Sequence, residues 1–207
     1  GKERCGKLEA VTLDLSAAYI KAVTEASPAA RLIFDRFHVQ RLAHDALDQV
    51  RRQQWREADP EQKAAIKGTR FALQKNPWNL TDVEHGKIAD VQRTNRPLYR
   101  GYLLKETLAK ILDGRQVNVA RDKLLEWTAW ATRSRLPPFR RVARTIRKYL
   151  DGIVAYVATG LNNGRTEGLN GKIRTITRRS FGFHSATSLV ALITLCCGGI
   201  ALSPVLR

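Results

Sequence analysis

Two short apolar runs in the first part of the chain, separated by a helical segment, predict two strands around one helix. Residues 8–13 form an apolar, β-favouring run that ends at Asp14, and residues 31–34 form a second run that ends at Asp35. A helix is expected between them, over residues 17–26. Such a unit has parallel strands, and metals and phosphates often bind at their carboxyl ends. Each aspartate can also be a simple turn or cap residue.

A helical period follows from residue 37 to about residue 133, with breaks near residues 59–60, 76–77 and 113–114. This region has no convincing strand pattern, so an all-α block is expected. The apolar residues expected to supply its core are Phe71, Leu73, Trp78, Leu80, Leu98, Tyr99, Tyr102, Leu103, Leu104, Leu108, Leu124, Leu125 and Trp127.

Beyond the break at residues 134–138, the pattern predicts an amphipathic helix over residues 139–150. Its apolar positions face the interior of the protein, and its arginines lie mainly on the other faces of the helix. Near the end of the chain, residues 186–202 are almost wholly apolar, which is at the lower limit for a membrane span. A buried core helix is the preferred interpretation of that segment, because it contains polar residues and glycines.

Residues 160–179 read as a glycine-punctuated loop that runs into a helix. On a helical projection Glu167 shares one face with an amide and two arginines, and Leu169 lies on the opposite face with Ile173 and Ile176, where it can pack on a core. One acid on a basic helix suits a phosphate-handling site with a metal-binding carboxylate. It equally suits a solvated face with one neutralising glutamate.

Charge favours a polyanionic partner. The 207 residues contain 36 Lys and Arg against 19 Asp and Glu, a net charge of +17. Residues 133–179 hold twelve basic and two acidic residues, and such clustering favours a nucleic acid over general solubility. The three cysteines form no metal-binding pattern, which favours a reducing compartment.

The acids and the imidazole expected at the ends of elements are Asp14, Asp35, His38 and Glu167. Two or three converging carboxylates suit Mg²⁺, and a pair of such ions serves phosphodiester chemistry. The sequence has no Ser-His-Asp set, Walker loop, HExxH motif or dinucleotide-binding fingerprint.

Several segments together resemble the DDE transposases of bacterial insertion sequences, in the ISL3 family. They are VTLDLSAAYI (11–20), PAARLIFDRFHV (28–39), VRR (50–52), KE (105–106), WTAWATRSR (127–135), NGRTEGLN (163–170) and FGFH (181–184). The resemblance runs in order along nearly the whole chain.

The resemblance implies an α/β protein, predominantly helical, with a partial ribonuclease H-like core and a large all-α insertion. Residues 1–44 would be the second half of that core, residues 45–138 the insertion domain, and residues 139–207 the C-terminal helices that carry the final acid. Trp127 or Trp130 would support DNA strand ends by stacking on unpaired bases, although a core aromatic is the simpler interpretation of both.

By the same resemblance, Asp14 is the second acid of the D-D-E triad and Glu167 the last, and both would bind Mg²⁺ or Mn²⁺. Asp35 and His38 match a D-x-x-H motif that supports the site. The residues expected to contact DNA are Arg140, Arg144, Arg147, Arg165, Asn170, Lys172, Arg174, Arg178 and Arg179. The expected partners are double-stranded transposon ends and target DNA, with a possible homo-oligomer, in the bacterial cytoplasm at the nucleoid and not at a membrane.

The first acid of the triad and the first three strands would lie upstream of Gly1, in a missing N-terminal part of the same enzyme. We therefore expect the chain to be unable to cut DNA by itself. An alternative from another class is a non-catalytic nucleic-acid-binding protein, either a transposase remnant or a domesticated regulator, in which Glu167 is only a surface residue. A third is a helical scaffold whose charge serves solubility.

Overall fold

The computed structural model describes residues 2–198, without the side chains of Lys2 and Arg165. Its strands are β1 (Ala10–Leu13) and β2 (Arg31–Phe34). Its helices are α1 (Lys2–Cys5), α2 (Ala17–Ala26), α3 (Arg36–Glu57), α4 (Pro60–Ile66), α5 (Arg70–Gln74), the 3₁₀ turn η1 (Pro77–Asn79), α6 (Asp82–Thr94), α7 (Arg96–Leu112), α8 (Val117–Arg133), α9 (Pro137–Lys148), α10 (Leu150–Thr159), α11 (Gly164–Arg179) and α12 (Ala186–Cys197). The chain divides into two units, residues 1–162 and 163–207.

The two strands pair in parallel, as the sequence predicts. Ala10 is aligned with Arg31 and Leu13 with Phe34, and α2 connects the strands. This strand-helix-strand unit confirms an α/β element within a mainly helical chain. The described strands are too few to identify a ribonuclease H-like sheet, which stays a prediction.

Helix α10 packs on β2 and was not predicted. A Cβ atom added to Gly152 would overlap the Phe34 ring and would lie 3.0 Å from the Leu32 carbonyl oxygen. Glycine is therefore required here because the helix backbone approaches the strand directly. Ile153 and Val154 are buried beside it, so α10 attaches the sheet to the helical block.

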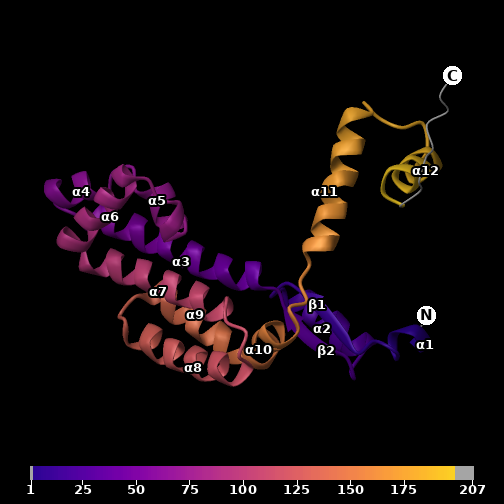
Figure 1. Ribbon diagram of the computed structural model, residues 1–207, viewed down its shortest axis with the longest axis horizontal. Helices are drawn as coiled ribbons and strands as arrows, with labels where there is room; N and C mark the ends of the chain where they lie inside the picture. The colour runs from indigo at the N-terminus through magenta and orange to yellow at the C-terminus, as the bar shows by residue number, and fades with distance from the viewer. Residues whose placement is uncertain (1, 199–207) are drawn as a thin grey trace. The chain divides into compact units, whose positions relative to one another are not determined.

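The helical block packs α3 against α7 and α9, and α8 against α9 (Figure 1). Its core includes a buried ion pair, in which the Lys105 ammonium contacts the Glu106 carboxylate. Lys105 also donates hydrogen bonds to the carbonyls of Leu73 at 2.9 Å and Lys75 at 3.0 Å. These bonds tie the end of α5 to α7, and a buried charge is tolerated only with such partners.

Part of the predicted core is confirmed and part is wrong. Leu73, Leu98, Tyr102, Leu104, Leu108, Leu124 and Trp127 are buried. Four other predicted core residues are exposed, namely Phe71, Trp78, Leu103 and Leu125. The short helix α5 buries Ala72 and Leu73 in place of Phe71, while Leu103 and Leu125 lie on the outer faces of α7 and α8.

The second unit, as far as it is described, consists of α11 packed against α12. The prediction of a buried helix over residues 186–202 is wrong for the described part, since α12 has no buried residue, and residues 199–202 lie outside the described range. The apolar face predicted for α11 is also not buried, with Leu169 43% exposed. Two helices alone cannot enclose an apolar core. Across residues 2–198, no helix has the length and apolar character needed to cross a membrane.

Candidate functional site

Asp14 and Asp35 each come directly after the last residue of one of the two paired strands, and the two strands end in register. Leu13 and Phe34 are the last aligned pair, and the Asp35 amide donates to the Leu13 carbonyl at 3.3 Å. Because parallel strands end at the same edge, both carboxylates lie at the carboxyl edge of the sheet. The sequence-based prediction that these residues share one edge is confirmed.

Both aspartates also organise the backbone that follows them. Asp14 Oδ1 accepts a hydrogen bond from the Ser16 amide at 3.1 Å. Asp35 is buried, and its Oδ1 accepts from the Phe37 amide at 2.7 Å, so it caps the N-terminus of α3. The local turn and cap roles that the sequence allowed are therefore real. The residue before α2, Ser16, makes no side-chain cap bond. These bonds fix each carboxylate relative to its strand.

His38 lies one turn into α3, three residues after Asp35. The spacing places both on the same side of the helix start. The imidazole is half-buried, and its ring meets that of Phe37 edge to face, with ring centres 5.5 Å apart. The D-x-x-H motif thus forms one local unit at the carboxyl end of β2.

Glu167 belongs to the second unit, where it lies in the first turn of α11. Its exposed side chain shares this helix with exposed polar and basic residues, which are Asn170, Lys172, Arg174, Arg178 and Arg179. Arg165 lies on the same helix, but its side chain is outside the described part of the structure. The described unit therefore presents an acid on a basic helix, as the sequence predicts.

Helix α9 provides a second basic surface, within the first unit. It buries Phe139, Val142 and Ile146, and it exposes Arg140, Arg144 and Arg147, as its amphipathic pattern predicts. Arg147 also donates to the Thr128 hydroxyl on α8 at 2.9 Å. Its guanidinium is consequently held in place, which lowers the entropy lost on binding an anion.

The donor chemistry at the strand ends suits a hard divalent cation, because Asp14 and Asp35 offer carboxylate oxygens. However, within residues 2–198 no three His, Cys, Asp or Glu side chains gather closely enough to hold a metal ion. One expected ligand, Asp14, thus lies at the same strand edge as the supporting residue Asp35, while the described residues assemble no group of three ligands.

Two contacts that position this edge were not predicted from the sequence. Gly152 on α10 packs against the ring of Phe34, the residue before Asp35. Arg36, inside the D-x-x-H motif, forms an ion pair with Asp113 after α7. A glycine in an otherwise apolar helix was a usable signal for the first contact. The second joins residues 77 positions apart in sequence, and nothing local indicates it.

Tryptophan 127 is a core residue, as the simpler interpretation of the sequence has it. Trp127 is 2% exposed, and its indole donates to the Leu104 carbonyl at 2.8 Å. Trp130 is half-buried and borders a cavity between α7 and α8. A base could not stack on Trp127 without unfolding that core.

The chain is similar in sequence to known transposases. A family model described as a transposase, of the DDE type and the ISL3 group, matches residues 1–193. The chain is 36% identical over 224 aligned positions to the transposase for insertion sequence element IS1557 of Mycobacterium tuberculosis, with 96% of this chain and 50% of that protein covered. It is 28% identical to the transposase for element IS1001 of Bordetella parapertussis, with 86% of this chain and 45% of that protein covered.

The chain therefore spans about half the length of the curated relatives it matches. No solved structure matches it.

Proposed function

The chain belongs to the ISL3 family of DDE transposases, and on that premise we propose that it carries the second and the last acid of a transposase active site. The intact enzyme hydrolyses phosphodiester bonds at the ends of an insertion sequence. It then joins the resulting 3′-hydroxyl groups to target DNA. Asp14 and Glu167 are the two acids, and Asp35 and His38 support them within a ribonuclease H-like core.

The observation that carries this proposal is the register of the two strands. It sets Asp14 and Asp35 at the same edge, where parallel α/β sheets commonly bind their ligands. In a helical, strongly basic chain of this family, two carboxylates at one strand edge are better explained by a site than by two isolated caps.

The roles of the chain's own residues follow from their positions. Asp14 and Glu167 would hold Mg²⁺ or Mn²⁺, which when bound lowers the pKa of an attacking oxygen and stabilises the leaving one. Asp35 caps α3 and so fixes the direction in which His38 leaves the sheet edge. The basic side chains of α9 and α11 bind phosphates and orient the DNA strand.

The proposal is tested in the intact transposase with a donor element in cells. Asp14→Asn and Glu167→Gln should each abolish excision, while binding of the purified proteins to terminal DNA persists. Glu61→Gln, which neutralises an exposed acid on α4, is the matched control and should excise normally. Excision by either site variant overturns the assignment. The 207-residue chain alone should cut no DNA with Mg²⁺ or Mn²⁺.

The second candidate is a non-catalytic DNA-binding protein. One observation favours it, namely that α9 exposes Arg140, Arg144 and Arg147, which can bind phosphates without a metal ion. In that case the intact protein binds DNA, and replacing Asp14 or Glu167 changes nothing that can be measured as excision or strand joining.

A further inference from the structure

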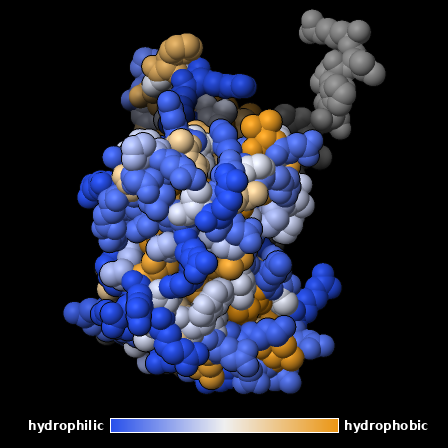
Figure 2. Space-filling view, turned by 90° about the vertical axis from the view of Figure 1, so that its left-hand side faces the viewer, coloured by the Kyte–Doolittle hydropathy of each residue, from blue (hydrophilic) through white to orange (hydrophobic). Residues whose placement is uncertain are grey.

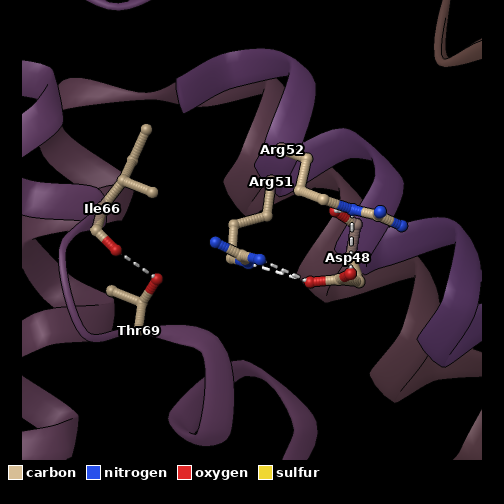
Figure 3. A network of polar contacts seen from close by, with 5 residues as sticks. All are labelled: Asp48, Arg51, Arg52, Ile66 and Thr69. Atoms are coloured by element: carbon tan, nitrogen blue, oxygen red, sulfur yellow. Dashed lines mark hydrogen bonds and ion pairs between the residues drawn. The ribbon is translucent and has the colours of Figure 1, made fainter. Parts of the chain in front are cut away.

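A hollow of about 260 Å³ lies on the first unit, away from the two aspartates in sequence and between the second half of α3 and the turn from α4 to α5. It is called the α3 groove below. Its main lining residues are Arg51, Arg52, Trp55 and Arg56 of α3, and Ile66 and Lys67 of the turn. Figure 3 shows the two sides of this groove facing one another.

One acid holds the arginines on the α3 side in place. Asp48 accepts hydrogen bonds from the Arg51 guanidinium at 2.7 and 3.0 Å, and the Arg52 guanidinium lies 3.0 Å from its other oxygen (Figure 3). On the opposite side, the Thr69 hydroxyl donates to the Ile66 carbonyl at 2.7 Å and closes the turn. Both walls of the groove are thus ordered before any ligand binds, which reduces the entropic cost of binding.

The groove retains an excess of positive charge. Asp48 can balance only one of its two arginines, and within residues 2–198 neither Arg56 nor Lys67 forms an ion pair. A further cation is close, because a Cβ atom added to Gly68 would lie 3.0 Å from the Lys87 ammonium. Several cations around one hollow with a single acid are suited to an anion.

The positive surface continues beyond the groove. A second hollow of about 380 Å³ shares Arg52 and Arg56 with it and extends to Pro137 and Arg141 at the start of α9. Arg141 is itself held by a hydrogen bond to the Gln49 amide oxygen. The two adjoining hollows together reach from Lys67 to Arg141, so they suit consecutive phosphates of a nucleic-acid backbone better than one isolated phosphate.

Trp55 gives the groove an aromatic face. It is 38% exposed and lines the groove together with basic side chains. Figure 2 shows the α4–α6 end of the first unit as mainly hydrophilic, with separate apolar patches and no continuous one. A broad hydrophobic protein interface is therefore not favoured on that end. An indole among arginines suits an unpaired base, which stacks on it while its phosphates meet the cations.

We propose that the α3 groove and its extension to Arg141 bind the phosphodiester backbone of DNA, with an unpaired base stacked on Trp55. The site is distinct in sequence from the strand edge, and Arg141 is not one of the three α9 arginines expected above to contact DNA. The proposal rests on the proposed function for the choice of DNA as the polyanion.

The test uses the 207-residue chain and a fluorescein-labelled 20-nucleotide DNA, single-stranded or duplex, with binding measured by anisotropy at several salt concentrations. Arg56→Ala should weaken binding to both DNA forms and lower the salt slope by about one unit. Trp55→Ala should weaken single-strand binding by about fivefold or more and should weaken duplex binding less.

Two control variants, Arg93→Ala and Trp78→Ala, remove the same kinds of exposed side chain outside the groove. Both should bind DNA as the unchanged chain does. Thermal melts confirm that each variant is folded.

The outcomes separate the two proposals. If the unchanged chain binds DNA and the Arg56 and Trp55 variants bind equally well, the α3 groove is not a DNA site, while the proposed function stands. If Arg56→Ala weakens binding but Trp55→Ala does not, the stacking role is wrong. If the unchanged chain binds neither DNA form, DNA is not the occupant of the groove, and the DNA-binding part of the proposed function fails with it.

Discussion

Gly152 of α10 packs directly against the ring of Phe34 on β2, one residue before Asp35. The spacing leaves no room for a methyl group. The position of a candidate active-site acid therefore depends on a glycine more than 100 residues away in sequence.

The first prediction concerns this contact. Gly152→Ala forces the Phe34 ring or α10 to move and should lower the free energy of unfolding by about 1–3 kcal/mol. Gly86→Ala is a matched control, because a Cβ atom at this exposed helical position of α6 meets nothing within 4 Å. The control should stabilise by about 0.5–1 kcal/mol through the higher helix propensity of alanine. Urea unfolding followed by circular dichroism measures both. Equal stabilities for the two variants would contradict the packing argument.

The second prediction concerns the buried ion pair. Lys105→Met leaves the Glu106 carboxylate buried without a cation and removes the donor to two carbonyls. The expected loss is about 3–5 kcal/mol of unfolding free energy. The buried Oε1 of Glu106 has no hydrogen bond within residues 2–198, so the pair itself is its partner. Lys110→Met on the exposed face of α7 should change stability by less than about 0.5 kcal/mol.

A double variant, Lys105→Met with Glu106→Leu, extends this prediction. Removing both charges removes the uncompensated carboxylate, so the double variant should be more stable than Lys105→Met alone. A double variant that is less stable than Lys105→Met would mean that Glu106 stabilises the fold through another contact.

The third prediction is a dependence of stability on pH. Burial lowers the pKa of His44 below its usual value of 6.5, and the positive charge of Lys105 lowers it further, while Asp45 opposes the shift. Below pH 6.5 the unfolded chain therefore binds a proton more readily than the folded chain at this residue, and stability falls as pH falls. His44→Gln should make the acid side of the stability profile shallower. An unchanged slope between pH 7 and 5 would show that His44 is not responsible.

The fourth prediction separates a core tryptophan from a surface one. Trp127→Phe loses the indole bond to Leu104 and leaves a void, at a cost of about 1–3 kcal/mol. Trp78 is 70% exposed, and Trp78→Phe should stay within about 0.5 kcal/mol of the unchanged chain. Chemical denaturation of the two variants gives the comparison, and similar losses for both would contradict it.

The strand edge could be predicted because its signals are local. The apolar runs before Asp14 and Asp35 are short, β-favouring and separated by a helix of the right length for a parallel pair. Helix α9 was predictable for the same reason, since its apolar and basic positions separate cleanly by angle. In both cases the pattern of neighbouring residues determines the structure.

The remaining features depend on tertiary packing. Phe71 and Leu73 are two residues apart and similarly apolar, yet only Leu73 is buried, which depends on how α5 packs on α3 and α6. Helix α10 is apolar nearly all round, so periodicity cannot indicate which face meets β2. The partners of Glu167 likewise depend on how distant parts of the chain fold together, which no local pattern encodes.

Helix α3 begins at the Asp35 cap and runs without interruption to Glu57. At 1.5 Å per residue, about 30 Å separates Asp35 from Arg56 along a single helix. If both proposals hold, this one helix spans the distance between a phosphate held at Arg56 and the reacting phosphate near Asp35, which corresponds to about nine base pairs of B-form DNA. Lengthening or shortening α3 by whole turns would then shift the position of strand cleavage along the element's end without altering any residue at the strand edge.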